Sequence, residues 1–164
     1  MNGNKIRIAG REDVPALAET IRISFRDVAE RFRLTLENCP KHPSNCTADW
    51  IIRDMARGVS YFVLESDGLI SGCVALERAD PDLCYLERLA VLPANRRCGY
   101  GHALVERSLT EAGRLGAARV SIGIIAQHTE LKHWYQKLGF VEGDTKEITH
   151  LPFKVMFMSY EKRS

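Results

Sequence analysis

Short apolar runs and helical periodicities alternate along the chain, with polar turn residues between them. The run "KIRIA" (Lys5–Ala9) predicts a first strand. Pro15, preceded by two acidic residues, is typical of a helix start. Apolar residues then recur at spacings of three and four as far as about Glu37. Because that span is long, we expect the helix to break near Arg26.

The middle of the chain reads as a loop, a helix and a run of strands. Asn38–Cys46 contains two prolines and predicts a loop. A helix is expected over Ala48–Arg57, and a hairpin over Tyr61–Ala79 turns at an Asp-Gly pair. The apolar run Leu83–Leu92 predicts a fourth strand.

The last third alternates helices and strands. We expect helices over Gly101–Leu115 and from Thr129 to Gly139, and strands over Ala118–Ile125, Glu142–His150 and Phe153–Glu161. The fold class is therefore α/β (α+β), with a mixed, mostly antiparallel central sheet of about seven strands flanked by helices. The fourth strand passes through a helix into the fifth, which predicts one parallel crossover.

Composition excludes several classes of function. The 164 residues fit one domain, and 45% hydrophobic with 27% charged residues is ordinary for a soluble protein. A net charge of +2 gives no bulk argument for a nucleic acid or membrane partner, and we expect neither. The N-terminus lacks the apolar core of a signal peptide. Five scattered cysteines then favour reduced thiols and a cytoplasmic location.

The stretch "VLPANRRCGYGHALVE" (Val91–Glu106) places arginines and glycines at a helix start. The first turn of a helix offers free backbone N–H groups and a partial positive charge, and glycines let a phosphate approach them. A strand-to-helix turn with solvated arginines explains the same composition equally well. The stretch is not a P-loop, because His102 follows the second glycine where that motif has lysine.

Three segments resemble one family. Arg96–Gly101 ("RRCGYG") resembles the Arg/Gln-x-x-Gly-x-Gly/Ala signature of the GCN5-related N-acetyltransferases (GNAT). Leu86–Pro93 ("LERLAVLP") resembles that family's fourth strand, and Trp134–Phe140 ("WYQKLGF") its Tyr-x-x-x-Gly-Phe segment. The element order fits from Lys5 to Glu161. The resemblance implies a single domain over residues 1–164 with the GNAT acyl-CoA acyltransferase fold, acetyl-CoA as cosubstrate and no metal.

The resemblance also implies where acetyl-CoA binds. The pantetheine arm would pair with the backbone where strands four and five splay, and His128 stands where members often carry an asparagine that contacts this arm. A solvated turn histidine is the alternative reading of His128. Arg96 and Arg97 would lend charge to the pyrophosphate. The implied backbone contacts are Leu89, Ala90 and Val91 for the arm, and Arg97, Cys98, Gly99, Tyr100, Gly101 and His102 for the pyrophosphate.

Two side chains are candidates for the chemistry. Tyr135 matches the family tyrosine that protonates the leaving thiolate, although a buried aromatic would look the same in the sequence. Glu87 is a candidate base, directly or through water, or else pairs with a neighbouring arginine. The amide of Leu89 is the candidate oxyanion donor.

The loop Asn38–Cys46 carries Cys39, His42 and Cys46. This spacing lacks the fourth ligand and regular pairs of a structural zinc site, and a disulfide needs an oxidising compartment. We expect the loop to shape the acceptor pocket or to be a rigid connection. His150–Phe153 is a second candidate pocket wall.

The prediction is an N-acetyltransferase that moves the acetyl group of acetyl-CoA directly to a primary amine of a small molecule or a protein, through a ternary complex. The alternative is a non-catalytic acyl-CoA-binding or regulatory module of the same fold. The sequence leaves open the acceptor and the choice between monomer and homodimer.

Overall fold

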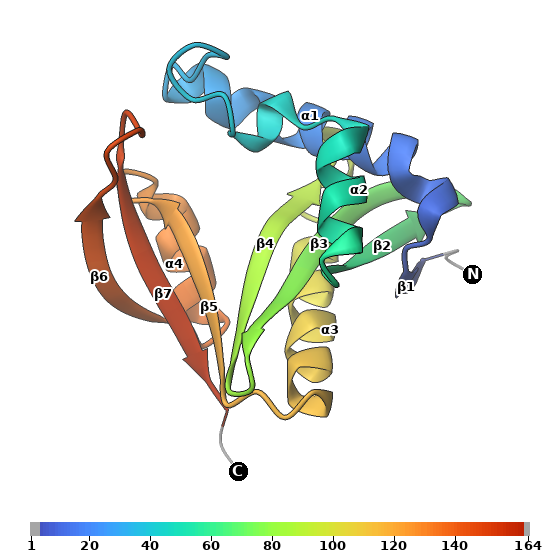
Figure 1. The fold of residues 1–164 in the computed structure, drawn as a ribbon. Coiled ribbons are helices and arrows are strands. Elements are labelled where there is room, and N and C mark those ends of the chain that lie inside the picture. The colour runs from blue at the N-terminus through green and yellow to red at the C-terminus, as the bar shows by residue number, and fades with distance from the viewer. Residues whose placement is uncertain (1–3, 163–164) are drawn as a thin grey trace.

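The protein, described here from a computed structural model over residues 4–162, contains one seven-stranded sheet with the order β1-β2-β3-β4-β5-β7-β6 (Figure 1). The strands are β1 (Lys5–Ile8), β2 (Ser60–Ser66), β3 (Leu69–Asp80), β4 (Leu83–Val91), β5 (Arg119–Ile125), β6 (Val141–Glu147) and β7 (Lys154–Glu161). The helices are α1 (Val14–Arg31), α2 (Ala48–Ala56), α3 (Tyr100–Arg114) and α4 (Thr129–Lys137). β4 and β5 are parallel and the other paired strands are antiparallel, which confirms the predicted fold class and crossover.

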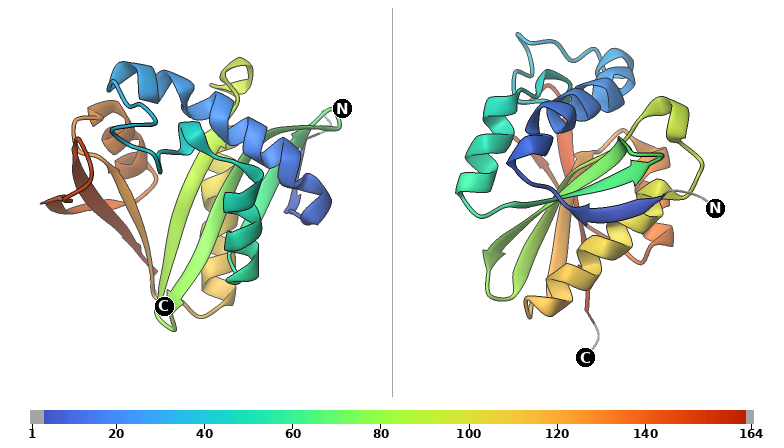
Figure 2. Two further views of the ribbon diagram at one scale, coloured as in Figure 1. Left: turned by 45° about the horizontal axis from the view of Figure 1, so that its top comes forward. Right: turned by 90° about the vertical axis from the view of Figure 1, so that its right-hand side faces the viewer.

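Helices cover both faces of the sheet. α1 and α2 lie on one face and α3 on the other (Figure 2). On the first face, Leu17 and Ile21 of α1 are fully buried against β2 and β3. On the second, Leu104 and Val105 of α3 share one apolar cluster with Tyr135 of α4. The apolar stripes of these helices thus hold the sheet from both sides.

The sheet opens between its two halves. The parallel ladder of β4 and β5 runs only from the Leu83–Arg119 pair to the Tyr85–Ser121 pair. Beyond Tyr85 the two strands diverge, and Figure 1 shows them as a V that opens away from the C-terminus. This divergence leaves one edge of β4 without a strand partner between Leu86 and Val91.

The first helix differs from the sequence prediction. α1 is continuous through Arg26 and ends at Arg31, not near Glu37. No break is needed because α1 buries apolar residues along its whole length, Leu17 and Ile21 in the cluster with β2 and β3, and Ala29 in a second cluster near its end. Arg33 has a φ of 56°, in the left-handed region, and turns the chain away. Leu36, expected on the apolar face, is 68% exposed.

The last two strands agree better with the prediction, although β6 ends at Glu147 and not at His150. All seven residues of β6 are exposed, as suits a polar edge strand.

Among the helices within residues 4–162, none is long and apolar enough to cross a membrane.

Candidate active site

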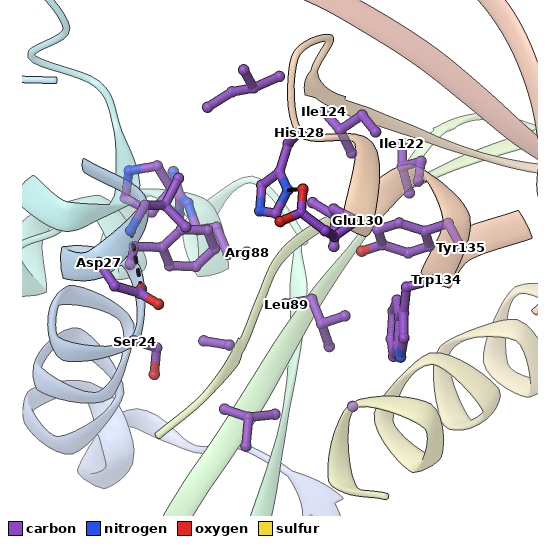
Figure 3. A pocket seen from close by; sticks show the side chains of 18 of the residues that line it. Ser24, Asp27, Arg88, Leu89, Ile122, Ile124, His128, Glu130, Trp134 and Tyr135 are labelled. Atoms are coloured by element: carbon purple, nitrogen blue, oxygen red, sulfur yellow. Dashed lines mark hydrogen bonds and ion pairs between the residues drawn. The ribbon is translucent and has the colours of Figure 1, made fainter. Parts of the chain in front are cut away.

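A cleft of about 1010 Å³ fills the opening between β4 and β5. It is lined by α1, β4, the start of α3, β5, α4 and the loop before β7. Figure 3 shows Trp134 and Tyr135 on one side, Ser24 and Asp27 on the other, and Leu89 between them. Of the predicted site residues, those that line the cleft are Glu87, Leu89, Ala90, Val91, Arg96, Arg97, Gly99, Tyr100, Gly101, His102, His128 and Tyr135. Cys98 is exposed and lies outside the lining.

The two glycines at the start of α3 are needed for different reasons. Gly99 has a φ of 80°, and a Cβ added there would meet nothing within 4 Å, so backbone conformation selects glycine. A Cβ on Gly101 would lie 3.1 Å from Cζ2 of Trp134, so close packing selects glycine there. Arg97 also has a positive φ, of 65°. The backbone amides before and within the first turn of α3 therefore stay accessible to an anion.

The two arginines before α3 have different environments. Nη1 of Arg96 lies 2.7 Å from Oδ2 of Asp27, and its Nη2 donates to the carbonyl of Ser24 at 2.7 Å. Its Nε donates to the carbonyl of Val91 at 3.2 Å. Arg96 thus connects β4 to α1, and Asp27 offsets its charge. Arg97 is exposed. Their contribution to pyrophosphate binding stays a prediction.

A bulge interrupts β4 within the cleft. Ala75 of β3 pairs with Glu87, and Cys73 with Ala90, so two residues of β4 face one residue of β3. Arg88, the first of these two, has a φ of 52°. The bulge directs Arg88 to the α2 side of the sheet, where it contacts Asp54, whereas the next residue packs with the α3 cluster.

Glu87 has the properties of a proton acceptor. Its side chain lines the cleft, and burial, together with the negative charge of Glu77, raises its pKa above the ordinary 4.5. A raised pKa makes a carboxylate a stronger base. In the described part of the chain, neither a hydrogen bond nor an ion pair joins Glu87 to an arginine.

Tyr135 is buried, with 5% of its surface exposed. Its ring lies edge-to-face with Trp134 at 5.0 Å and with Phe140 at 5.2 Å between centroids. The hydroxyl end points into the cleft (Figure 3). Burial raises the pKa of this phenol well above its usual value near 10, so the hydroxyl keeps its proton at neutral pH.

Comparison with known proteins identifies this architecture. Residues 57–142, just over half of the chain, match the family described as "Acetyltransferase (GNAT) domain". The chain belongs to the GNAT family. It is therefore an acetyl-CoA-dependent acetyltransferase domain, and the resemblance seen in the three sequence segments is confirmed.

Relatives of this GNAT chain have several named activities. An amino-acid acetyltransferase of Aeromonas salmonicida is 30% identical over 112 residues, which are 63% of this chain and 22% of that protein. The chain thus spans about a fifth of the length of this curated relative. The structure is similar to the ribosomal-protein-S18-alanine N-acetyltransferase of Escherichia coli, with a TM-score of 0.77, 19% identity and coverage of 96% and 93% of the two chains. The PaiA N-acetyltransferase of Thermoplasma acidophilum in complex with coenzyme A gives a TM-score of 0.76, with 17% identity and coverage of 98% and 99%. At these identities the two structures establish the shared fold.

His128 stands at the N-cap position of α4 in this GNAT domain, and its side chain makes no capping hydrogen bond. Its ring lies 5.6 Å from that of Phe32, and Nδ1 is 3.9 Å from Oε1 of Glu130. Within residues 4–162 this buried Nδ1 has no hydrogen-bond partner. Burial, reinforced by Arg31, lowers the pKa of the imidazole. His128 is therefore a neutral group on the cleft wall at neutral pH.

Sequence reasoning missed a polar group beside the cleft. The Arg88 guanidinium contacts both Asp54 and Tyr61, and lies 5.3 Å from the centroid of the Trp50 ring. The Tyr61 hydroxyl donates to Oδ2 of Asp54 at 2.6 Å. Asp54 lies three residues after Ile51, on the buried side of α2, and this position was the available signal. Its partner Arg88 is 34 residues away in the sequence.

The loop Asn38–Cys46 reaches the cleft through His42 and Pro43, and Phe153 of the second predicted wall also lines it. The five cysteines are free thiols, Cys39 and Cys46 included. Across the described residues, no group of three or more potential metal ligands is found.

Proposed function

We propose that this GNAT domain transfers the acetyl group of acetyl-CoA directly to a primary amine, with both substrates bound at once. One observation carries the proposal: Tyr135 and Glu87, a proton donor and a proton acceptor, line the same cleft at the opening of β4 and β5. The pyrophosphate is assigned to the amides at the start of α3, and the pantetheine arm to the unpaired edge of β4 at Leu89–Val91.

The chemistry requires a neutral amine. An alkylamine with a pKa near 10.4 costs about 4.6 kcal/mol to deprotonate at pH 7. Glu87, with its raised pKa, accepts that proton directly or through water. The amine nitrogen attacks the thioester carbonyl carbon, and the Leu89 amide donates to the developing oxyanion. As the C–S bond breaks, the Tyr135 hydroxyl donates its proton to the thiolate. The nitrogen loses its second proton to solvent as the amide forms, and a proton from solvent restores the Tyr135 hydroxyl.

The partners proposed are acetyl-CoA and an amine acceptor of a small molecule or a protein. The named activities of the relatives, on amino acids and on a ribosomal-protein alanine, fall within this range. The five free thiols fit the predicted cytoplasmic location.

Release of the CoA thiol from acetyl-CoA tests the proposal. A panel of primary amines should give release well above the rate of thioester hydrolysis without an amine, and mass spectrometry should find the acetylated amine. Calorimetric binding of acetyl-CoA with no amine-dependent release would instead identify a binding module without turnover.

A further inference from the structure

The part of the cleft away from α3 is the acceptor end, and an apolar cluster borders it at Phe153. We call this cluster the roof. The end of α1 and the segment after it pack there against the connection between β6 and β7, in one apolar cluster that spans the opening of the sheet. The roof includes Ala29, Phe32, Leu34, Cys39, Leu151 and Phe153. In Figure 1 these two segments lie at the same end of the molecule, where β4 and β5 are farthest apart.

An ion pair reinforces the roof. The guanidinium of Arg31 on α1 makes two hydrogen bonds with the carboxylate of Glu130 on α4, each of 2.9 Å. The Phe32 and His128 rings meet beside it. A polypeptide that crossed this opening would have to displace both the apolar cluster and the paired ions. The roof therefore favours an acceptor that fits beneath it.

Part of the wall of the acceptor end is apolar or neutral. Phe25 of α1 and Phe153 line it, and the His42 ring lies edge-on to Phe25 at 5.7 Å between centroids. Nδ1 of His42 accepts from the Ser44 amide, and burial lowers the pKa of His42 to about 4. His42 is thus uncharged at neutral pH. These walls suit an acceptor with an apolar body.

Charge pairing leaves one carboxylate free. Arg88 pairs with Asp54, Arg31 with Glu130, and Arg96 with Asp27. Among the charged side chains that line the acceptor end within residues 4–162, Glu87 is the one without an oppositely charged partner in contact. One unpaired carboxylate matches one cationic amine. An additional anionic group on the acceptor would lose its water, and the cations at this end of the cleft are already paired with carboxylates.

From these observations, and resting on the proposed function, we infer that the acceptor is a small amine on an apolar chain or ring, without an anionic group, and not a lysine within a polypeptide. The whole cleft of about 1010 Å³ must hold the pantetheine arm as well, which leaves room for a compact acceptor only.

Three acceptors of matched chemistry test the inference with the full chain and acetyl-CoA. These are 2-phenylethylamine, L-phenylalanine, which adds only a carboxylate, and a peptide capped at both ends with one central lysine. We expect kcat/KM for CoA release to be roughly tenfold or more higher for phenylethylamine than for phenylalanine, because the added carboxylate lacks a free cation. The capped peptide should give no release above hydrolysis.

Two variants extend the test. Phe153→Ala should raise the KM for phenylethylamine several-fold with little change in acetyl-CoA affinity. Phe157→Ala, in β7 four residues further along the chain and outside the cleft lining, should leave this KM unchanged, and thermal melting checks that both variants fold.

The outcomes separate the two proposals. A preference for phenylalanine, which would assign its carboxylate to the remaining N–H groups of Arg88, overturns the inference, as does a preference for the peptide. In both cases the proposed function stands. If acetyl-CoA binds but none of the three acceptors gives CoA release, the result counts against the proposed function and this inference together.

Discussion

The two ends of the cleft are built from different parts of the chain. The proposed donor end uses backbone: the amides at the start of α3, kept accessible by Gly99 and Gly101, and the edge of β4 that is left unpaired where β5 diverges. The acceptor end uses side chains from α1, the loop after it and the β6–β7 connection. A ligand held by backbone tolerates changes in most side chains, whereas a pocket made of side chains changes with each substitution. One fold can therefore keep its donor and vary its acceptor.

The most damaging change to the chemistry should come from one hydroxyl at the donor end. Tyr135→Phe removes the proton for the leaving thiolate, and we expect kcat to fall about 10²-fold or more. Because the backbone groups proposed to hold the cosubstrate are untouched, the Kd for acetyl-CoA should stay nearly unchanged. A stopped assay of CoA release measures kcat, and calorimetry measures the Kd for acetyl-CoA. Tyr160→Phe, outside the cleft lining, is the matched control. Full turnover in Tyr135→Phe would remove this tyrosine from the mechanism.

At the acceptor end, Glu87→Gln should lower kcat/KM by about 10²-fold at neutral pH. In the unmodified protein, kcat/KM should rise with pH as Glu87 loses its proton, and burial places this limb above pH 4.5. The limb should be absent from the variant. A pH profile of kcat/KM measures it.

Glu77→Gln gives the matching control. Removal of this neighbouring negative charge lowers the pKa of Glu87, so the limb should move to lower pH while the maximal rate is kept. An unmoved limb would assign the titration to another group.

Much of the difference between the donor end and the acceptor end of the cleft could be predicted from the sequence. Glycine spacing, apolar strands and the helix start marked the donor end, because backbone geometry restricts residue choice locally. The pairing of Arg88 with Asp54 could not be predicted, because it joins distant segments. Asn38–Cys46 and His150–Phe153 were predicted as pocket walls, but the contact between their segments in the roof was not. The end of α1 was also misjudged, since Leu36 continues the helical spacing but is exposed once Arg33 turns the chain.

The two glycines allow a finer test of the donor end. Gly101→Ala places a methyl group against Trp134 and should weaken acetyl-CoA binding roughly tenfold, equivalent to ~1.4 kcal/mol. Gly99→Ala has free space but an unfavourable φ, and should instead cost about 1–2 kcal/mol of stability. Calorimetry and chemical denaturation of both variants measure these effects. Equal effects of the two variants on both quantities would contradict the separate roles.

The smallest effects should come from substitutions of Arg96 and Arg97, and they should differ between these two arginines. Arg97→Ala should weaken acetyl-CoA binding a few-fold at low salt and less at high salt, because an exposed charge is screened. Arg96→Ala should also raise the KM of the amine, because it frees α1 from β4. Steady-state kinetics at two salt concentrations measure both variants. Equal effects of the two variants on acetyl-CoA binding and on the KM of the amine would contradict the separate roles of Arg96 and Arg97.

The three contacts of Arg96 have a consequence for how the two cosubstrates affect each other's binding. This side chain is attached at once to β4, which borders the donor, and to α1, which borders the acceptor. In the proposed complex acetyl-CoA lies on β4 and the start of α3, and the same guanidinium would restrain α1 beside the amine. Thermodynamic linkage then requires each cosubstrate to tighten the other by an equal factor. We therefore expect the amine to bind more tightly to the acetyl-CoA complex than to the empty protein, and acetyl-CoA to gain the same factor when the amine is bound.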